Sequence, residues 1–164
     1  MKNIIPMSKW GRDHWSTFAY IGSIQADRGG RPTLSRMRCH PRIHTSRDDR
    51  LRGLTVTRDS WSKTRLKDGS EINDHDDWSC VDDMEAAGLV EQNGTGLSPI
   101  LDLTPIGWEV YFQMQKHIKC NQLWSETFEP DMDKARKRAE MERKCELVST
   151  STPSETEPLD SPAP

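Results

Sequence analysis

The stretch that decides the fold runs from Asp76 to Ile118 and reads DDWSCVDDMEAAGLVEQNGTGLSPILDLTPIGWEVYFQMQKHI. Apolar residues recur at three-residue spacing over residues 76–87 and stop at Gly88, which predicts a helix that ends at a glycine. Residues 89–103 contain two short apolar runs on either side of an Asn-Gly turn, and this pattern predicts a β-hairpin. A second helix is predicted from Pro105 onward, packed back on the hairpin.

The same stretch resembles part of a known family. The run Met84-Glu-Ala-Ala-Gly-Leu-Val-Glu91, followed by a glycine-containing turn and by Leu103-Thr-Pro-Ile-Gly107, resembles the second half of winged-helix regulators. The resemblance covers about residues 74–118 and implies a helix, a wing and a further helix start in a DNA-binding transcription regulator. Residues 75–91 also look like a segment of small uncharacterised bacterial and phage proteins, from which no activity carries over.

The rest of the chain divides by composition. A first helix is predicted over Asp13–Ala26, where apolar and aromatic residues recur at helical spacing and should face the core. Residues 28–70 hold isolated apolar residues among turn formers, which predicts short strands and long loops, with a turn at 67–69. The sequence therefore predicts one α+β domain that is winged-helix-like, with a β-hairpin wing and a disordered C-terminal tail. Its parts are a basic N-terminal part (1–70), a winged-helix-like part (71–118), a charged helical extension (119–148) and a disordered acidic tail (149–164).

Charge is distributed very unevenly along the chain. Residues 1–67 carry 15 Lys and Arg against 5 Asp and Glu, whereas residues 68–117 carry 1 against 11. The basic charge is densest over residues 28–52, which contain eight Arg, two Asp and two His. Guanidinium groups make bidentate contacts with phosphate, so this Arg-rich stretch is the candidate nucleic-acid contact. Its arginines are Arg28, Arg31, Arg36, Arg38, Arg42, Arg47, Arg50 and Arg52.

The acidic helix predicted at 76–87 is a second candidate surface. It carries five carboxylates and no Lys or Arg, so it is not expected to enter a major groove, where the carboxylates would face phosphates. Instead it could pair with the Arg-rich stretch, or dock on a basic protein partner together with the flexible C-terminal segment. The carboxylates are Asp76, Asp77, Asp82, Asp83 and Glu85. Two functions stay open: a nucleic-acid-associated, regulatory module and a protein-interaction module.

Two pairs of side chains have the chemistry of a zinc site without a standard spacing. Cys39 with His44, and His75 with Cys80, could together supply two sulfur and two nitrogen donors, which tetrahedral zinc accepts. Neither pair forms a CxxC or HxxxH motif. The alternative is a chain without a cofactor, with a core thiol at Cys80 and a helix-start residue at His75.

No motif points to catalysis. The sequence contains no Gly-x-Ser-x-Gly, no Walker loop and no dinucleotide-binding fingerprint. No base, nucleophile and orienting group can be nominated together, so we expect a non-catalytic protein without a small-molecule substrate. The first residues lack the apolar stretch of a secretory signal, and no apolar run is long enough to span a bilayer. We therefore expect a cytoplasmic protein with reduced thiols and no membrane role.

Overall fold

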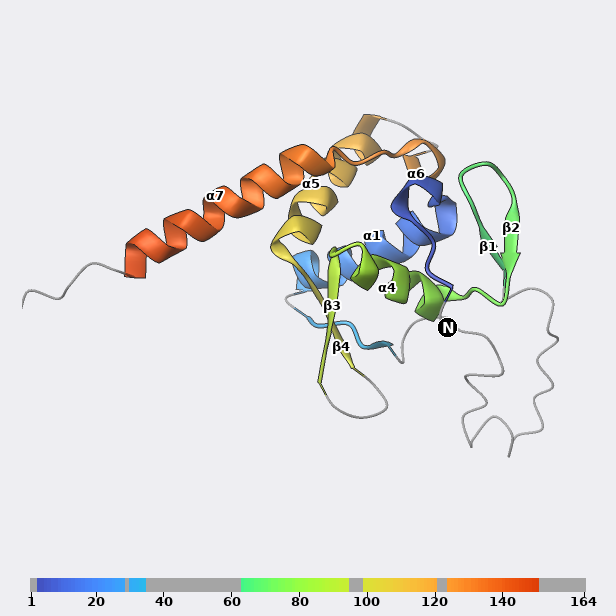
Figure 1. The fold of residues 1–164 in the computed structure, drawn as a ribbon, viewed down its shortest axis with the longest axis horizontal. Helices are drawn as coiled ribbons and strands as arrows, with labels where there is room; N and C mark the ends of the chain where they lie inside the picture. Colours follow the sequence, from blue (N-terminus) through green and yellow to red (C-terminus); the bar gives the residue numbers. More distant parts are fainter. Residues whose placement is uncertain (1–2, 29, 35–62, 95–98, 121–123, 151–164) are drawn as a thin grey trace, which may run out of the picture.

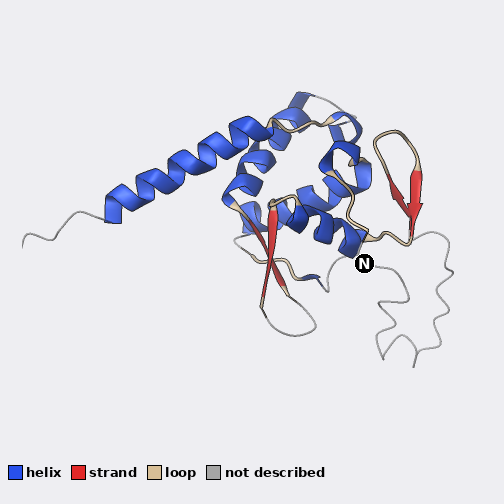
Figure 2. Ribbon diagram, in the orientation of Figure 1, coloured by secondary structure: helices blue, strands red, loops and turns tan. Residues whose placement is uncertain are grey.

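The structure is a computed structural model that describes residues 3–28, 30–34, 63–94, 99–120 and 124–150 (Figure 1). Within these residues the fold combines helices with two small antiparallel sheets (Figure 2), so the predicted α+β class is confirmed. The helices are α1 (Arg12–Arg28), α4 (Asp77–Ala86), α5 (Pro105–Cys120), α6 (Trp124–Thr127) and α7 (Met132–Thr150), with a 3-10 turn at Met7–Lys9. The strands are β1 (Lys63–Arg65), β2 (Glu71–Asn73), β3 (Val90–Asn93) and β4 (Ile100–Leu103).

Helix α1 forms the centre of the core. Its side chains Trp15, Phe18 and Ile21 are buried, as their helical spacing predicts. The ring of Trp15 makes edge contacts with Trp10 and Phe128, with ring centroids 5.0 and 4.8 Å apart. Such edge-to-face pairs add a favourable electrostatic interaction to the burial of large rings. The aromatic stripe of α1 is therefore a packing surface on which the N-terminal turn, α4 and α6 rest.

Strands β3 and β4 form the predicted hairpin directly after α4. Gly88 follows that helix with φ of 74°, the left-handed conformation that glycine favours and that the sequence predicts at this position. The strands pair antiparallel, with Val90 opposite Leu103 and Asn93 opposite Ile100. Val90 and Leu103 are both buried, so this end of the hairpin closes the core. The prediction of paired strands within residues 89–103 is confirmed.

Residues 32–34 lie along the other edge of β4. The backbone N–H of Leu101 donates to the carbonyl of Pro32 at 2.8 Å. An isolated antiparallel bridge joins Thr33 to Ile100. The hairpin thus has a third, strand-like neighbour that comes from just beyond the end of α1.

A second hairpin, β1–β2, flanks the turn predicted at 67–69, with β1 inside the region where short strands were predicted and β2 just beyond it. Thr64 lies opposite Ile72 in this hairpin, and Gly69 in the turn has φ of 83°. Each strand is three residues long and mostly exposed, apart from the buried Thr64. Such short polar strands leave almost no alternation of apolar and polar residues, which is why the sequence pattern does not locate them.

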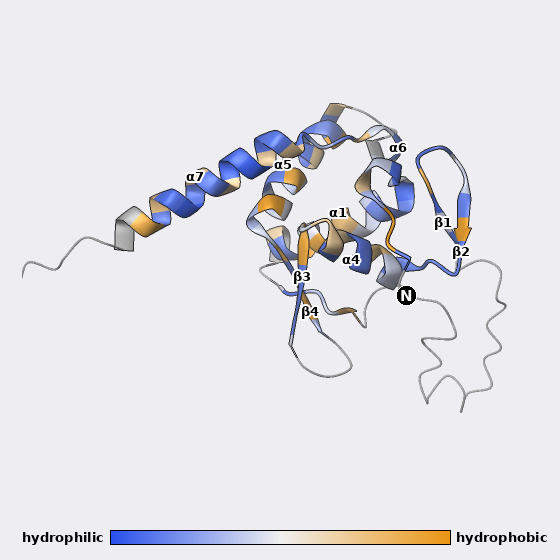
Figure 3. Cartoon of the chain, in the orientation of Figure 1, coloured by the Kyte–Doolittle hydropathy of each residue, from blue (hydrophilic) through white to orange (hydrophobic). Residues whose placement is uncertain are grey.

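Helix α7 is anchored by its first half and then leaves the body of the fold. Just before it, the Gln113 side chain of α5 binds the backbone of Asp131 twice, accepting from its N–H at 2.8 Å and donating to its carbonyl at 3.0 Å. Ala135 is fully buried, whereas residues 141–147 are exposed. Figure 3 shows this outer half as a largely hydrophilic helix that extends away from the other elements. The helix continues to Thr150, slightly past the predicted start of the tail. Across the described residues, none of the helices is both long and apolar enough to cross a bilayer.

Candidate functional site

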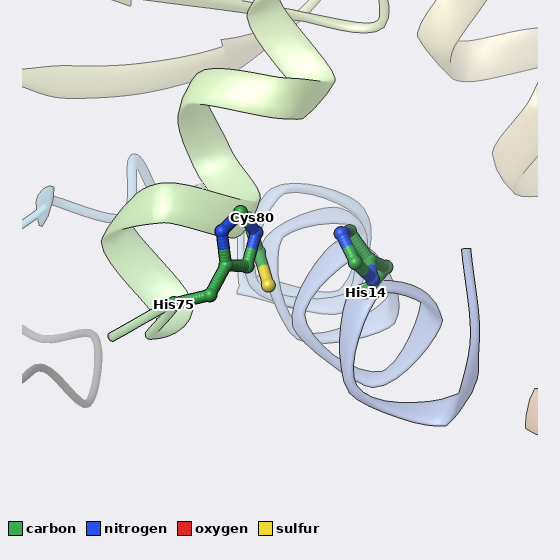
Figure 4. Close-up of side chains that lie close together, drawn as sticks. All are labelled: His14, His75 and Cys80. Atoms are coloured by element: carbon green, nitrogen blue, oxygen red, sulfur yellow. The ribbon is translucent and has the colours of Figure 1, made fainter. Parts of the chain in front are cut away.

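Four ionisable side chains, His14, His75, Cys80 and Asp83, meet in the core between α1 and α4, and we call them the His–Cys–Asp cluster; Figure 4 shows the first three. His14 comes from the first turn of α1, His75 from the residue before the N-cap of α4, and Cys80 and Asp83 from α4 itself. All four residues are buried, with at most 3% of their surface exposed. One ligand atom from each of His14, His75 and Cys80 lies within 4.8 Å of the other two.

Asp83 is the hub of the cluster. Its Oδ2 atom accepts hydrogen bonds from Nε2 of His14 at 2.9 Å and from Nε2 of His75 at 2.8 Å. Its Oδ1 atom accepts from the backbone N–H of Ile5 at 2.8 Å. A buried carboxylate needs such partners because burial removes its hydration. A single side chain on α4 therefore holds the N-terminal segment, α1 and the start of its own helix together.

The protonation states follow from burial and from these contacts. Burial opposes the ionisation of Asp83, but hydrogen bonds from His14, His75 and the Ile5 backbone outweigh it, so its pKa is lowered and the group is a carboxylate at neutral pH. Burial lowers the pKa of His14, against the opposing effect of its hydrogen bond to Asp83, so this imidazole is neutral. Burial raises the pKa of the Cys80 thiol well above its usual value.

Turns on either side place His75 in the cluster. The chain leaves β2 through Asp74, which has φ of 61°. Asp76 then caps α4, because its side chain accepts from the N–H of Ser79 at 3.0 Å. Between these residues, the carbonyl of His75 accepts from the Thr64 hydroxyl at 2.6 Å. Through this hydrogen bond, the short β1–β2 hairpin fixes the backbone that carries His75.

Aromatic packing places His14. Its ring stacks on Trp10, with centroids 5.2 Å apart and planes 7° from parallel. Trp10 is itself fixed by its indole N–H, which donates to the carbonyl of Ile5 at 2.9 Å. The second ring nitrogen of His14, Nδ1, is buried and has no hydrogen-bond partner among the described residues. Among the described residues, only one of the two ring nitrogens of His14 therefore has a hydrogen-bond partner.

The structure brings together half of the zinc set predicted from the sequence. His75 and Cys80 belong to the cluster, whereas Cys39 and His44 lie outside the described residues. Sequence reasoning missed His14, which takes a place beside them. A signal was present, because His14 stands on the apolar face of the first predicted helix, and an ionisable group on a buried face needs a partner elsewhere in the core.

The carboxylates predicted to form a docking surface are largely used inside the fold. Two of them, Asp76 and Asp83, are 3% and 1% exposed, so the predicted surface does not extend to them. Asp77 accepts from the Thr17 hydroxyl at 3.3 Å. The side-chain amide of Gln92 on β3 donates to the last two, Asp82 and Glu85, at 3.3 and 2.9 Å.

The Arg-rich stretch is described only at its beginning. Arg28 is the last residue of α1, and Arg31 lies beside the hairpin, with its Nε atom 3.3 Å from the carboxylate of Asp102 on β4. The Arg31 side chain is 68% exposed, so this ion pair contributes little to stability. The other arginines, Arg36, Arg38, Arg42, Arg47, Arg50 and Arg52, lie outside the described residues.

Two features thus stand out: a buried cluster of metal-ligating chemistry, and a basic stretch that starts at the edge of a hairpin. They are formed by different residues and face different surroundings, since the first is closed off from solvent and Arg31 of the second is exposed. Comparison with protein-family models, with curated proteins and with solved structures gives no match.

Proposed function

We propose that the chain is a non-catalytic, winged-helix-like module that binds nucleic acid through its Arg-rich stretch, residues 28–52. The observation that carries the proposal is the succession of α4, the β3–β4 hairpin and α5. This is the order that the resemblance over residues 74–118 implies, with the hairpin in the place of the wing.

The path of the chain at the beginning of the Arg-rich stretch supports this function. Residues 32–34 are hydrogen-bonded along β4, and Arg31 projects beside them toward Asp102. The stretch therefore starts at the edge of the wing, where the backbone holds it against the folded domain. Arginines whose backbone is already held in place bind a polyanion at a lower entropic cost than arginines on a free chain do.

The contact would differ from that of a typical helix-turn-helix reader. The outward carboxylates of α4, Asp82 and Glu85, would repel phosphates, and this helix carries no Lys or Arg to offset them. Binding is therefore assigned to the Arg-rich stretch and the wing edge. Contacts of this kind go mainly to the phosphate backbone, so we expect weak dependence on nucleic-acid sequence.

The test is the salt dependence of binding to duplex and single-stranded nucleic acid, measured by fluorescence anisotropy. Each phosphate contact that an arginine makes contributes about 0.9 to the slope of log affinity against log salt for duplex DNA. Replacing Arg36, Arg38 and Arg42 together with Ala should then flatten the slope by up to about 3 and weaken binding alike across unrelated sequences.

A matched control removes the same number of charges elsewhere. Lys137, Arg143 and Lys144 are exposed on α7, far along the chain from the basic stretch, and their joint replacement with Ala should leave the slope nearly unchanged. Equal effects of the two triple variants would mean that only net charge matters and would contradict the proposal. Absence of any binding at low salt would favour the alternative, a module that docks on a basic protein.

A further inference from the structure

We propose that the His–Cys–Asp cluster is a structural zinc site, in which His14, His75, Cys80 and Asp83 bind one ion between α1 and α4. The site is separate from the proposed nucleic-acid contact. It differs from the set suggested by the sequence, because it takes its remaining donors from α1 and α4 in place of Cys39 and His44.

The donor set matches zinc. Zinc in proteins is bound by imidazole nitrogen, thiolate and carboxylate oxygen in tetrahedral geometry, with bonds of about 2.0–2.3 Å. Ligand atoms of such a site lie roughly 3–4 Å apart. In the cluster, the atoms offered by His14, His75 and Cys80 lie within 4.8 Å of one another, so they need to close by only about 1 Å. A thiolate among the donors favours zinc over magnesium or calcium, which prefer oxygen.

Asp83 is the proposed fourth ligand, and it would have to move closer to Cys80, because only the ligand atoms of His14, His75 and Cys80 all lie within 4.8 Å of one another. Its Oδ2 atom is already 2.9 and 2.8 Å from the Nε2 atoms of His14 and His75, and its Oδ1 atom is held by the Ile5 backbone. A divalent ion with one thiolate, one carboxylate and two neutral imidazoles has no net charge. A neutral centre avoids most of the desolvation penalty of burying an ion, which suits residues with almost no exposed surface.

Without a metal ion, the cluster stabilises the core less than apolar side chains of the same size would. The residues sacrifice apolar packing for two imidazoles, a carboxylate and a thiol, yet one carboxylate oxygen serves both rings and Nδ1 of His14 has no partner among the described residues. A small domain gains stability from a metal ion that joins segments distant in sequence. Because the cluster is closed to solvent, the ion would hold the fold together and would not activate water.

The experiment starts with tag-free protein, expressed with zinc and purified without chelator. Elemental analysis should find about one zinc ion per chain, and chelation should lower the thermal midpoint. X-ray absorption at the zinc edge should show one sulfur and three nitrogen or oxygen neighbours. Two sulfur neighbours would mean that a second cysteine binds, as in the set with Cys39, and would overturn the assignment.

Cobalt substitution identifies the thiolate. The cobalt-loaded wild type should show tetrahedral d–d absorption and a thiolate-to-cobalt charge-transfer band. Cys80→Ser should lose the charge-transfer band, whereas Cys145→Ser, at an exposed position on α7, should keep it. If Cys80→Ser does not fold, the number of sulfur neighbours from X-ray absorption of the wild type still tests the assignment. Folded wild type that carries no zinc and gains no thermal stability from added zinc would overturn the proposal.

Discussion

Gly22 of α1 lies so close to the ring of Tyr111 on α5 that a Cβ atom on the glycine would overlap with the ring. Both residues are buried, so a ring that moves away would disturb its neighbours in the core. The absence of a side chain at Gly22 therefore sets how closely α1 and α5 approach each other.

Replacing Gly22 with Ala should destabilise the domain. Alanine favours a helix over glycine by about 1 kcal/mol, but overpacking a core costs typically 1–3 kcal/mol, so we expect a net loss of about 1 kcal/mol in the free energy of unfolding. Urea denaturation measures it. Ser23→Ala, one residue along the same helix, should change stability by less than about 0.5 kcal/mol. A more stable Gly22→Ala variant would show that α1 and α5 are less tightly packed.

Asp83→Ala should be among the most damaging substitutions on α4. It leaves three buried donors without an acceptor, two imidazole N–H groups and the Ile5 backbone, and should lower the free energy of unfolding by about 3 kcal/mol or more. The neighbouring Asp82→Ala should change it by less than about 1 kcal/mol, since Asp82 lies partly exposed at the surface. Denaturation of chelator-treated protein reports the hydrogen bonds alone. Similar losses in both variants would argue against a central role for Asp83.

At Gln25, the stability of the domain should depend more on the chemistry of the side chain than on its size. Its amide donates to the carbonyl of Leu101 at 2.7 Å and accepts from the N–H of Leu103 at 3.1 Å, as a neighbouring strand would. Gln25→Ala should cost about 1 kcal/mol for the lost hydrogen bonds. Gln25→Glu should cost more, because the new carboxylate would face the Leu101 carbonyl and the side chain of Asp102. Thermal melts above pH 7 test this order, and a Gln25→Glu variant as stable as wild type would contradict it.

The thermal midpoint should fall only when a truncation from the C-terminus reaches the first half of α7. Removing residues 149–164 should leave the thermal midpoint nearly unchanged, because their composition offers little apolar surface to bury. Removing 141–164 should also have a small effect, since residues 141–147 are exposed. Removing 132–164 should lower the midpoint clearly, because it takes away the buried Ala135 and the contact of Arg138 with Glu109 at 3.2 Å. A gradual decline across the three truncations would contradict an anchor confined to the first half of α7.

The elements with strong local signals could be predicted from the sequence. Helix α4 ends where Gly88 predicts, and the hairpin strands pair where the two short apolar runs predict them, because these signals act over a few positions. Asn93 itself belongs to β3 and pairs with Ile100, so the connection is longer than the predicted tight turn. Helix α1 was predicted as Asp13–Ala26 and runs from Arg12 to Arg28, since the aromatic stripe marks its centre better than its ends.

The candidate site could be predicted only in part, because its contacts are long-range. His75 and Cys80 were recognised as possible ligands, being five positions apart on either side of a helix start. His14 and Asp83 are 69 positions apart, and no local pattern relates them. Asp83 was interpreted as one of several surface carboxylates, because it is not part of the three-residue apolar repeat of its helix, and its burial becomes visible only from the packing of α1.

The distance along the chain between α1 and its partners has a consequence for synthesis. The stripe of Trp15, Phe18 and Ile21 leaves the ribosome well before Asp83, and Tyr111, the partner of Gly22, emerges later still. At a translation rate of about 5–20 residues per second, the interval between Gly22 and Tyr111 is roughly 5–20 s. During that time the aromatic face of the nascent α1 is uncovered, and α1 cannot complete its packing until α4 and α5 have been made.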